Sequence, residues 1–180
     1  MKTKSLSVFP ACALAFAAGL WSAPAASAST VLTSISPQTL EALLEAEGAM
    51  LTQVTTGGDT TLRSEPLQIG PSDVKPIAFE VFFYECDGGD FIDPAGPGSA
   101  CLSFEYRALA PSLVPGEDAE IANRWNEIYH FGKAWRDELG EVALQMSVVV
   151  DGGVTEENIR ATYRRWRITL AAFAEYLDME

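Results

Sequence analysis

The side chains of this chain that could carry chemistry are a single histidine, several carboxylates, two cysteines and a group of arginines. His130 is the one histidine in the sequence, which excludes a metal site built from several histidines. No serine and aspartate are spaced around it in a way that indicates a Ser-His-Asp triad. We therefore expect His130 to be a polar residue at the end of a helix.

Three aspartates in a glycine-rich stretch are the first candidate metal ligands. Asp87, Asp90 and Asp93 could offer oxygen atoms to calcium. Their spacing differs from that of an EF-hand loop, and no glutamate follows at the position that would bind the ion through both oxygens. We expect a surface loop here, and we predict no metal site in the protein.

Three glutamates are the candidates for acid–base chemistry or for binding a small ligand. Glu80, Glu85 and Glu105 fall on neighbouring predicted strands and could converge. Exposed carboxylates are common on sheets, however, and the sequence contains neither of the glycine motifs that bind nucleotide phosphates. We predict that the protein is not an enzyme and binds no cofactor.

Cys86 and Cys101 are predicted to form a disulfide. The segment between them holds four glycines and two prolines, and a strand is predicted on each side. Antiparallel pairing of those strands would bring the two thiols opposite each other. The bond would close a loop of roughly 15 residues and stabilise the fold by about 3 kcal/mol. Zinc needs four ligands, and a redox pair is usually spaced C-x-x-C, so both of those alternatives are disfavoured.

The first 28 residues have the features of a secretory signal peptide. Lys2 and Lys4 precede a short apolar run, and an A-x-A cleavage site ends at Ala28. The run is shorter than the ~20 residues that a membrane-spanning helix needs. We therefore expect residues 1–28 to be a signal peptide, residues 29–180 to form one domain, and the protein to be periplasmic or secreted. The third cysteine, Cys12, would be removed with the signal.

The charge of the chain excludes some classes of partner. It holds 25 acidic and 12 basic residues, for a formal net charge of −13. The predicted signal peptide contains two of the lysines and no acid, so cleavage would make the charge −15. Such a charge repels phosphate backbones and anionic lipids, so we expect no nucleic-acid partner and no membrane anchor after cleavage.

The order of predicted elements indicates an α+β fold. A first helix begins with Ser36 as its cap and Pro37 in its first turn, and it ends at Gly48. Period-two alternation is clearest in the strand before the last helix. Four strands are predicted after the first helix, over residues 50–55, 60–64, 77–86 and 101–109. A second helix is predicted over residues 118–133, followed by a hairpin of two strands over 134–136 and 141–150. The last helix begins with Thr155 as its cap.

The last helix carries a regular apolar stripe and a group of arginines. We expect the stripe to cover the protein's own sheet, and a seam between two protomers is the alternative. The arginines are expected to pair with acids nearby, such as Glu156 with Arg160, and a site for an acidic ligand is the alternative. The stripe is Ile159, Tyr163, Trp166, Leu170, Phe173 and Leu177; the arginines are Arg160, Arg164 and Arg167.

Several segments point together to one family. They are residues 82–86 (FFYEC), 101–104 (CLSF), 124–127 (RWNE), 131–134 (FGKA) and 146–155 (MSVVVDGGVT), followed by Trp166 and Phe173. In this order they resemble the YbjN domain, over about residues 36–177. The resemblance implies an antiparallel sheet flanked by helices in the order α-β-β-β-α-β-β-α, similar to type III secretion chaperones. It also implies the role in bacterial sensory transduction that is ascribed to the family.

These observations lead to one expected function and two alternatives. We expect a non-catalytic exported protein that binds a protein or peptide in the bacterial envelope, with a regulatory or chaperone-like role. The first alternative is a small-ligand carrier or an enzyme that uses the sheet carboxylates. The second is a structural protein that associates with itself, for example as a homodimer.

Overall fold

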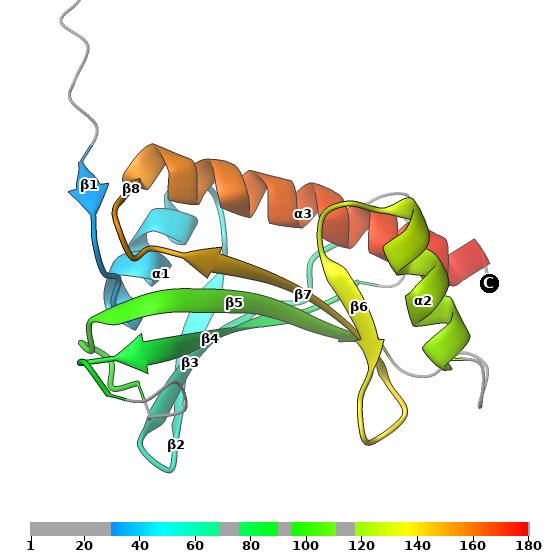
Figure 1. Ribbon diagram of the computed structural model, residues 1–180, viewed down its shortest axis with the longest axis horizontal. Helices are drawn as coiled ribbons and strands as arrows, with labels where there is room; N and C mark the ends of the chain where they lie inside the picture. Colours follow the sequence, from blue (N-terminus) through cyan, green and yellow to red (C-terminus); the bar gives the residue numbers. More distant parts are fainter. Residues whose placement is uncertain (1–29, 69–75, 90–94, 111–117, 180) are drawn as a thin grey trace, which may run out of the picture.

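The computed structural model of the protein describes residues 30–68, 76–89, 95–110 and 118–179. Its centre is a six-stranded antiparallel sheet in the order β2-β3-β4-β5-β7-β6 (Figure 1). The predicted signal peptide lies outside the described residues. The strands of the sheet are β2 (Leu51–Thr56), β3 (Asp59–Ser64), β4 (Phe79–Cys86), β5 (Cys101–Ala110), β6 (Lys133–Arg136) and β7 (Val142–Val149).

Within the described ranges three helices accompany the sheet, so the predicted α+β class is confirmed. They are α1 (Pro37–Glu45), α2 (Asp118–Ile128) and α3 (Glu156–Met179). The described residues between α1 and α2 form four strands, β2 to β5, which is one more than the order implied by the resemblance. The extra strand arises because the turn at Gly57 and Gly58 divides this segment into a hairpin of its own.

The predicted helix caps are present. The Ser36 hydroxyl accepts a hydrogen bond from the Thr39 amide at 3.1 Å, and the Thr155 hydroxyl accepts one from the Asn158 amide at 3.1 Å. After α1 the chain reverses at Gly48, where φ is +85°, a conformation that glycine adopts without strain. These contacts place the starts of α1 and α3 where the sequence predicts them.

The face of the sheet that meets α3 carries an aromatic core. The register places Val81 opposite Tyr106 and Phe83 opposite Phe104, all on this face. Trp166 stacks on Tyr106 with ring centroids 5.4 Å apart. The stripe of α3 is buried within the single chain, with exposed fractions between 0% and 6%, as predicted for a helix that covers its own sheet: Ile159, Tyr163, Trp166, Leu170, Phe173 and Leu177.

The predicted end of the second helix was wrong. The helix was expected to reach Lys133, but α2 ends at Ile128 and Lys133 is the first residue of β6. The chain reverses at Gly132, where φ is +78°, and the Trp125 indole donates to the Gly132 carbonyl at 3.2 Å. The Asn126 side chain both donates to and accepts from the Ala134 backbone at 2.8 Å. These bonds attach β6 directly to α2.

A small second sheet joins the start of the described chain to the segment just before α3. β1 (Val31–Leu32) pairs with β8 (Val154–Thr155), which immediately precedes α3. Ile35 forms an isolated bridge with Cys101 and is 1% exposed. Residues 31–35, before α1, are therefore attached to both sheets. Among the described helices, none is long and apolar enough to cross a membrane.

Candidate functional site

The second face of the sheet is not covered by any described helix. α1 and α3 lie on the aromatic face, and α2 packs against α3 through Trp125, whose ring lies 5.1 Å from that of Phe173 (Figure 1). Because side chains alternate along a strand, every second residue of the central strands points away from the helices. The uncovered face therefore presents Glu80, Phe82, Tyr84, Ser103, Glu105, Arg107 and Leu109.

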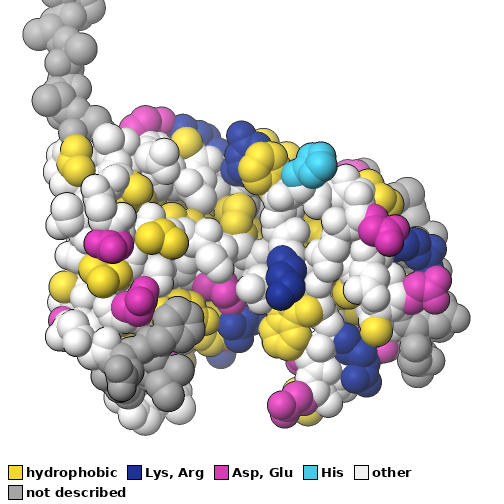
Figure 2. Space-filling view, in the orientation of Figure 1, with side chains coloured by type: hydrophobic (Ala, Val, Ile, Leu, Met, Phe, Trp, Pro, Cys, Tyr) yellow, Lys and Arg dark blue, Asp and Glu magenta, His cyan; other side chains and the backbone are white. Residues whose placement is uncertain are grey.

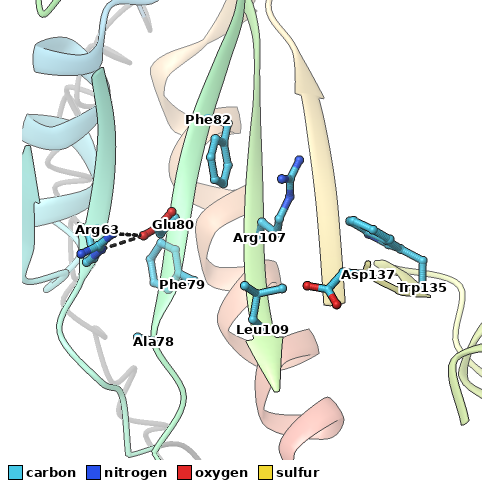
Figure 3. Close-up of a pocket in the computed structure, with 9 residues that line it drawn as sticks. All are labelled: Arg63, Ala78, Phe79, Glu80, Phe82, Arg107, Leu109, Trp135 and Asp137. Carbon is cyan, nitrogen blue, oxygen red and sulfur yellow. Dashed lines mark hydrogen bonds and ion pairs between the residues drawn. The ribbon is translucent and has the colours of Figure 1, made fainter. Parts of the chain in front are cut away.

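A cavity of about 310 Å³ opens on this uncovered face (Figure 3). The register places Leu109 and Trp135 on either side of Ala143, and both side chains line the cavity. In the space-filling view the molecule is hollowed below the sheet, between its left and right ends (Figure 2). The cavity is lined by Arg63, Ala78, Phe79, Glu80, Phe82, Arg107, Leu109, Trp135 and Asp137.

Arg107 is held in place by its neighbours on the same face. Its Nη2 atom donates to Glu105 Oε1 at 2.7 Å and to the Tyr84 hydroxyl at 3.2 Å. Its guanidinium lies 4.3 Å from the centre of the Phe82 ring, and Glu105, only 7% exposed, also accepts from the Ser147 hydroxyl at 3.2 Å. Buried charges need such partners, and Arg107 is the member of this ion pair that lines the cavity.

The Tyr84 hydroxyl stays protonated beside this ion pair. Burial raises its pKa, and the nearby Glu105 carboxylate adds to the rise, because both disfavour a phenolate. Arg107 acts in the opposite direction through its charge and its hydrogen bond, but less strongly. Tyr84 therefore serves as a neutral partner of Arg107, and the geometry gives it no role as a base.

Two further polar groups border the cavity on opposite sides. On β3 and β4, Arg63 and Glu80 form an ion pair, with 2.6 Å between Nε and Oε1 (Figure 3). On the β6–β7 turn, Asp137 Oδ1 accepts from the Leu139 amide at 2.9 Å and from the Glu141 amide at 2.8 Å. The cavity thus combines apolar side chains with charged groups, most of which already have partners.

The three candidate glutamates bind different groups and do not form a common site. Glu80 pairs with Arg63, Glu105 pairs with Arg107, and Glu85 accepts a hydrogen bond from Ser103 at 3.4 Å. Of the three, only Glu80 lines the cavity. The arrangement offers no pair of carboxylates aimed at one reacting atom.

Cys86 and Cys101 are joined in a disulfide across β4 and β5. Both residues are buried, and the next residue, Asp87, accepts a hydrogen bond from the Ala100 amide at 2.9 Å. The pKa of Asp87 is lowered, mainly by a hydrogen bond from the Ser99 side chain and to a smaller extent by the one from the Ala100 amide. Asp87 therefore fastens the ends of the loop, in keeping with the surface loop that was expected.

Of the three aspartates considered as calcium ligands, Asp87 is the one that lies among the described residues. Asp90 and Asp93 lie outside the described residues. Across the described ranges, no three residues with metal-binding side chains come together.

Two arginines of the α3 group, Arg160 and Arg164, are paired with nearby acids, as expected. Arg160 lies 3.6 Å from Glu156, one turn earlier on the helix. Arg164 bonds to Glu157 at 2.6 Å and to Glu47, just after α1, at 3.0 Å, so it also ties α1 to α3. These pairs account for two of the three arginines without an acidic ligand.

His130 is exposed just after the end of α2, where the sequence places a polar residue. It borders a second hollow on the outside of the molecule, together with Phe131 and Lys133. No hydrogen bond or ion pair of His130 occurs among the described residues, so it has no partner there that would orient it for catalysis.

Sequence reasoning missed most of the residues that line the cavity. Arg107, Leu109 and Trp135 were read only as parts of strands, and Asp137 only as part of a turn. The alternation of side chains along each strand could have identified them. It assigns Arg107 and Leu109 to the face opposite the aromatic core, where an apolar residue needs an explanation.

The architecture defines an α+β protein whose antiparallel sheet has helices on one face and a recessed, partly apolar surface on the other. The chain belongs to the YbjN family, described as "Putative bacterial sensory transduction regulator", which matches residues 79–179. The match begins at the first residue of β4 and includes every lining residue of the cavity except Arg63 and Ala78. No curated protein matches the chain.

Proposed function

We propose that the protein is an exported, non-catalytic binding module of the bacterial envelope that engages a protein or peptide through the uncovered face of its sheet. The observation that carries this proposal is the recessed surface formed by Phe82, Leu109 and Trp135. Leu109 is 45% exposed on a sheet face that no described helix covers. Apolar surface in such a place is typical of an interaction site.

A polypeptide fits this surface better than a small ligand. Pockets for small molecules usually measure about 300–1,000 Å³ and bury most of the ligand, and this cavity is at the low end of that range. The charged groups beside it, Arg107 with Glu105 and Arg63 with Glu80, already neutralise each other. These ion pairs can position a segment of polypeptide. They leave few free polar groups that could bind one small molecule specifically.

Two features support export to an oxidising compartment. Residues 1–28 have the pattern of a signal peptide, and the disulfide between Cys86 and Cys101 is of a kind that persists outside the cytoplasm. The regulatory role ascribed to the family suits a protein that recognises a partner and catalyses nothing. Together these features favour a partner in the periplasm or at the cell surface.

Capture from envelope extract with matched variants tests the proposal. Leu109→Glu places a charge on the recessed face, whereas Ile168→Glu changes a residue of α3 that is 72% exposed. We expect the wild type and Ile168→Glu to retain the same partner and Leu109→Glu to lose it, at equal thermal stability. Retention of the partner by Leu109→Glu, or loss by both variants, would count against the uncovered face as the binding surface.

A further inference from the structure

One charge at the cavity has no opposite charge beside it. Asp137 uses Oδ1 to accept from the Leu139 and Glu141 amides, while its Oδ2 atom has no partner among the described residues. The close-up shows this carboxylate beside Leu109 and Trp135 (Figure 3). Because the other charges that line the cavity are paired with each other or with Glu105, the cavity keeps one negative charge.

The surface next to Asp137 is apolar and aromatic. Trp135 and Leu109 both line the cavity, and a long side chain placed in it would lie across them. The aliphatic stem of a lysine or arginine packs well on such surface while its charged end stays near water. An indole ring attracts a cation that approaches its face.

We infer that the cavity recognises a lysine or arginine side chain of the bound segment. The stem lies on Leu109 and Trp135, and the cationic end meets Asp137. This inference rests on the proposed function and adds the chemistry of the residue that is recognised. The net charge of −13 supports it, because an acidic protein attracts basic segments from a distance and repels acidic ones.

Arg107 does not oppose this recognition. Its charge is neutralised by Glu105 at 2.7 Å, and its guanidinium is stacked on Phe82 and lies 5.9 Å from the centre of the Trp135 ring. The cation of the partner would approach from the Asp137 side, where the unpaired carboxylate oxygen lies.

Three labelled peptides and two variants test the inference. The probes are blocked nine-residue peptides of alternating threonine and valine, with lysine, norleucine or glutamate at the centre. Asp137→Asn removes the charge but keeps the side-chain oxygen that accepts from the Leu139 and Glu141 amides. Glu138→Gln is the matched control, because Glu138 is an exposed acid on the same turn that does not line the cavity.

Fluorescence anisotropy gives the affinity of the full exported chain for each probe. We expect the wild type to bind the lysine peptide about fivefold more tightly than the norleucine peptide, and the glutamate peptide most weakly. Asp137→Asn should abolish the lysine advantage, and Glu138→Gln should keep it. Raising the salt concentration should reduce it, since part of the gain is electrostatic.

Other outcomes separate this inference from the proposed function. Equal binding of the lysine and norleucine peptides, with loss of both in Leu109→Glu, would overturn the inference and leave the docking surface in place. A lysine advantage that survives in Asp137→Asn would also overturn it. If no peptide binds, the inference fails, and capture with Leu109→Glu still decides the proposed function.

Discussion

Replacing Trp166 tests whether α3 is the cover of the protein's own sheet. Trp166 is 0% exposed, stacks on Tyr106 and meets the Phe79 ring edge-on, with centroids 5.9 Å apart. Its indole nitrogen is buried and has no hydrogen-bond partner among the described residues. The residue therefore contributes through packing, and its polar atom contributes nothing favourable.

The structure gives a magnitude for two different replacements. A buried tryptophan side chain removes about 200 Å² of mostly apolar surface from water on folding, which at about 25 cal/mol per Å² corresponds to about 5 kcal/mol that the truncation forfeits. Trp166→Ala should therefore cost about 3–5 kcal/mol. Trp166→Phe keeps the aromatic contacts and removes an unpaired buried donor, which itself costs about 1–3 kcal/mol. The phenylalanine variant should thus stay within about 1.5 kcal/mol of the wild type.

Urea unfolding, followed by circular dichroism, measures both changes, and sedimentation measures the association state. A Trp166→Phe variant as unstable as Trp166→Ala would mean that the indole nitrogen makes a hydrogen bond that the structure lacks. If the α3 stripe instead joined two protomers, the association state would change. Trp166→Ala would then be a folded monomer, and the wild-type melting temperature would rise with protein concentration. A stable monomeric Trp166→Ala derived from a wild-type dimer would refute core packing.

Three further predictions concern the sheet and its loop. Cys86→Ser should leave Cys101 as a free thiol and lower the free energy of unfolding by about 2–4 kcal/mol in urea titrations, without a loss of partner binding. Glu105→Gln should cost about 1–3 kcal/mol in the same assay, because it leaves the Arg107 charge with a neutral partner. Asp87→Asn should be less stable than the wild type at pH 7 and equal to it at low pH, in unfolding titrations at both pH values. The lowered pKa of Asp87 stabilises the fold above the unfolded pKa of about 3.9, and this contribution is lost as the pH falls through the folded pKa.

Each of these three predictions has an outcome that would contradict it. A loss of partner binding in Cys86→Ser, at a temperature where the variant is folded, would give the disulfide a role in recognition. An unchanged stability of Glu105→Gln would show that the ion pair with Arg107 contributes nothing. A stability difference for Asp87→Asn that persists at low pH would mean that its hydrogen bonds matter and its charge does not.

The sequence predicts local features well because their causes are local. Ser36 caps α1 and Thr155 caps α3 through hydrogen bonds that reach only three residues along the chain. The disulfide follows from two strands and a short loop between its cysteines. Helix α2 was predicted too long because the side-chain bonds that end it, from Trp125 and Asn126, connect it to residues beyond the helix.

The candidate site could not be predicted because it depends on the order and register of distant strands. Tyr84, Arg107 and Ser147 meet around Glu105 only when β7 pairs beside β5. Leu109 and Trp135 line one cavity because β5, β7 and β6 align so that both residues lie beside Ala143 of β7. Composition and periodicity assign each residue to a face, but they do not state which strands are neighbours.

Site-specific photo-cross-linking in living cells tests the central claim most directly. A photoreactive amino acid replaces Leu109 on the recessed face or, as the control, Ile168 on the outside of α3. We expect one defined protein or peptide adduct from position 109, formed in the periplasm or at the cell surface, and none from position 168. An adduct from position 168 alone, or an adduct formed only in the cytoplasm, would contradict an exported module that binds its partner through the uncovered face.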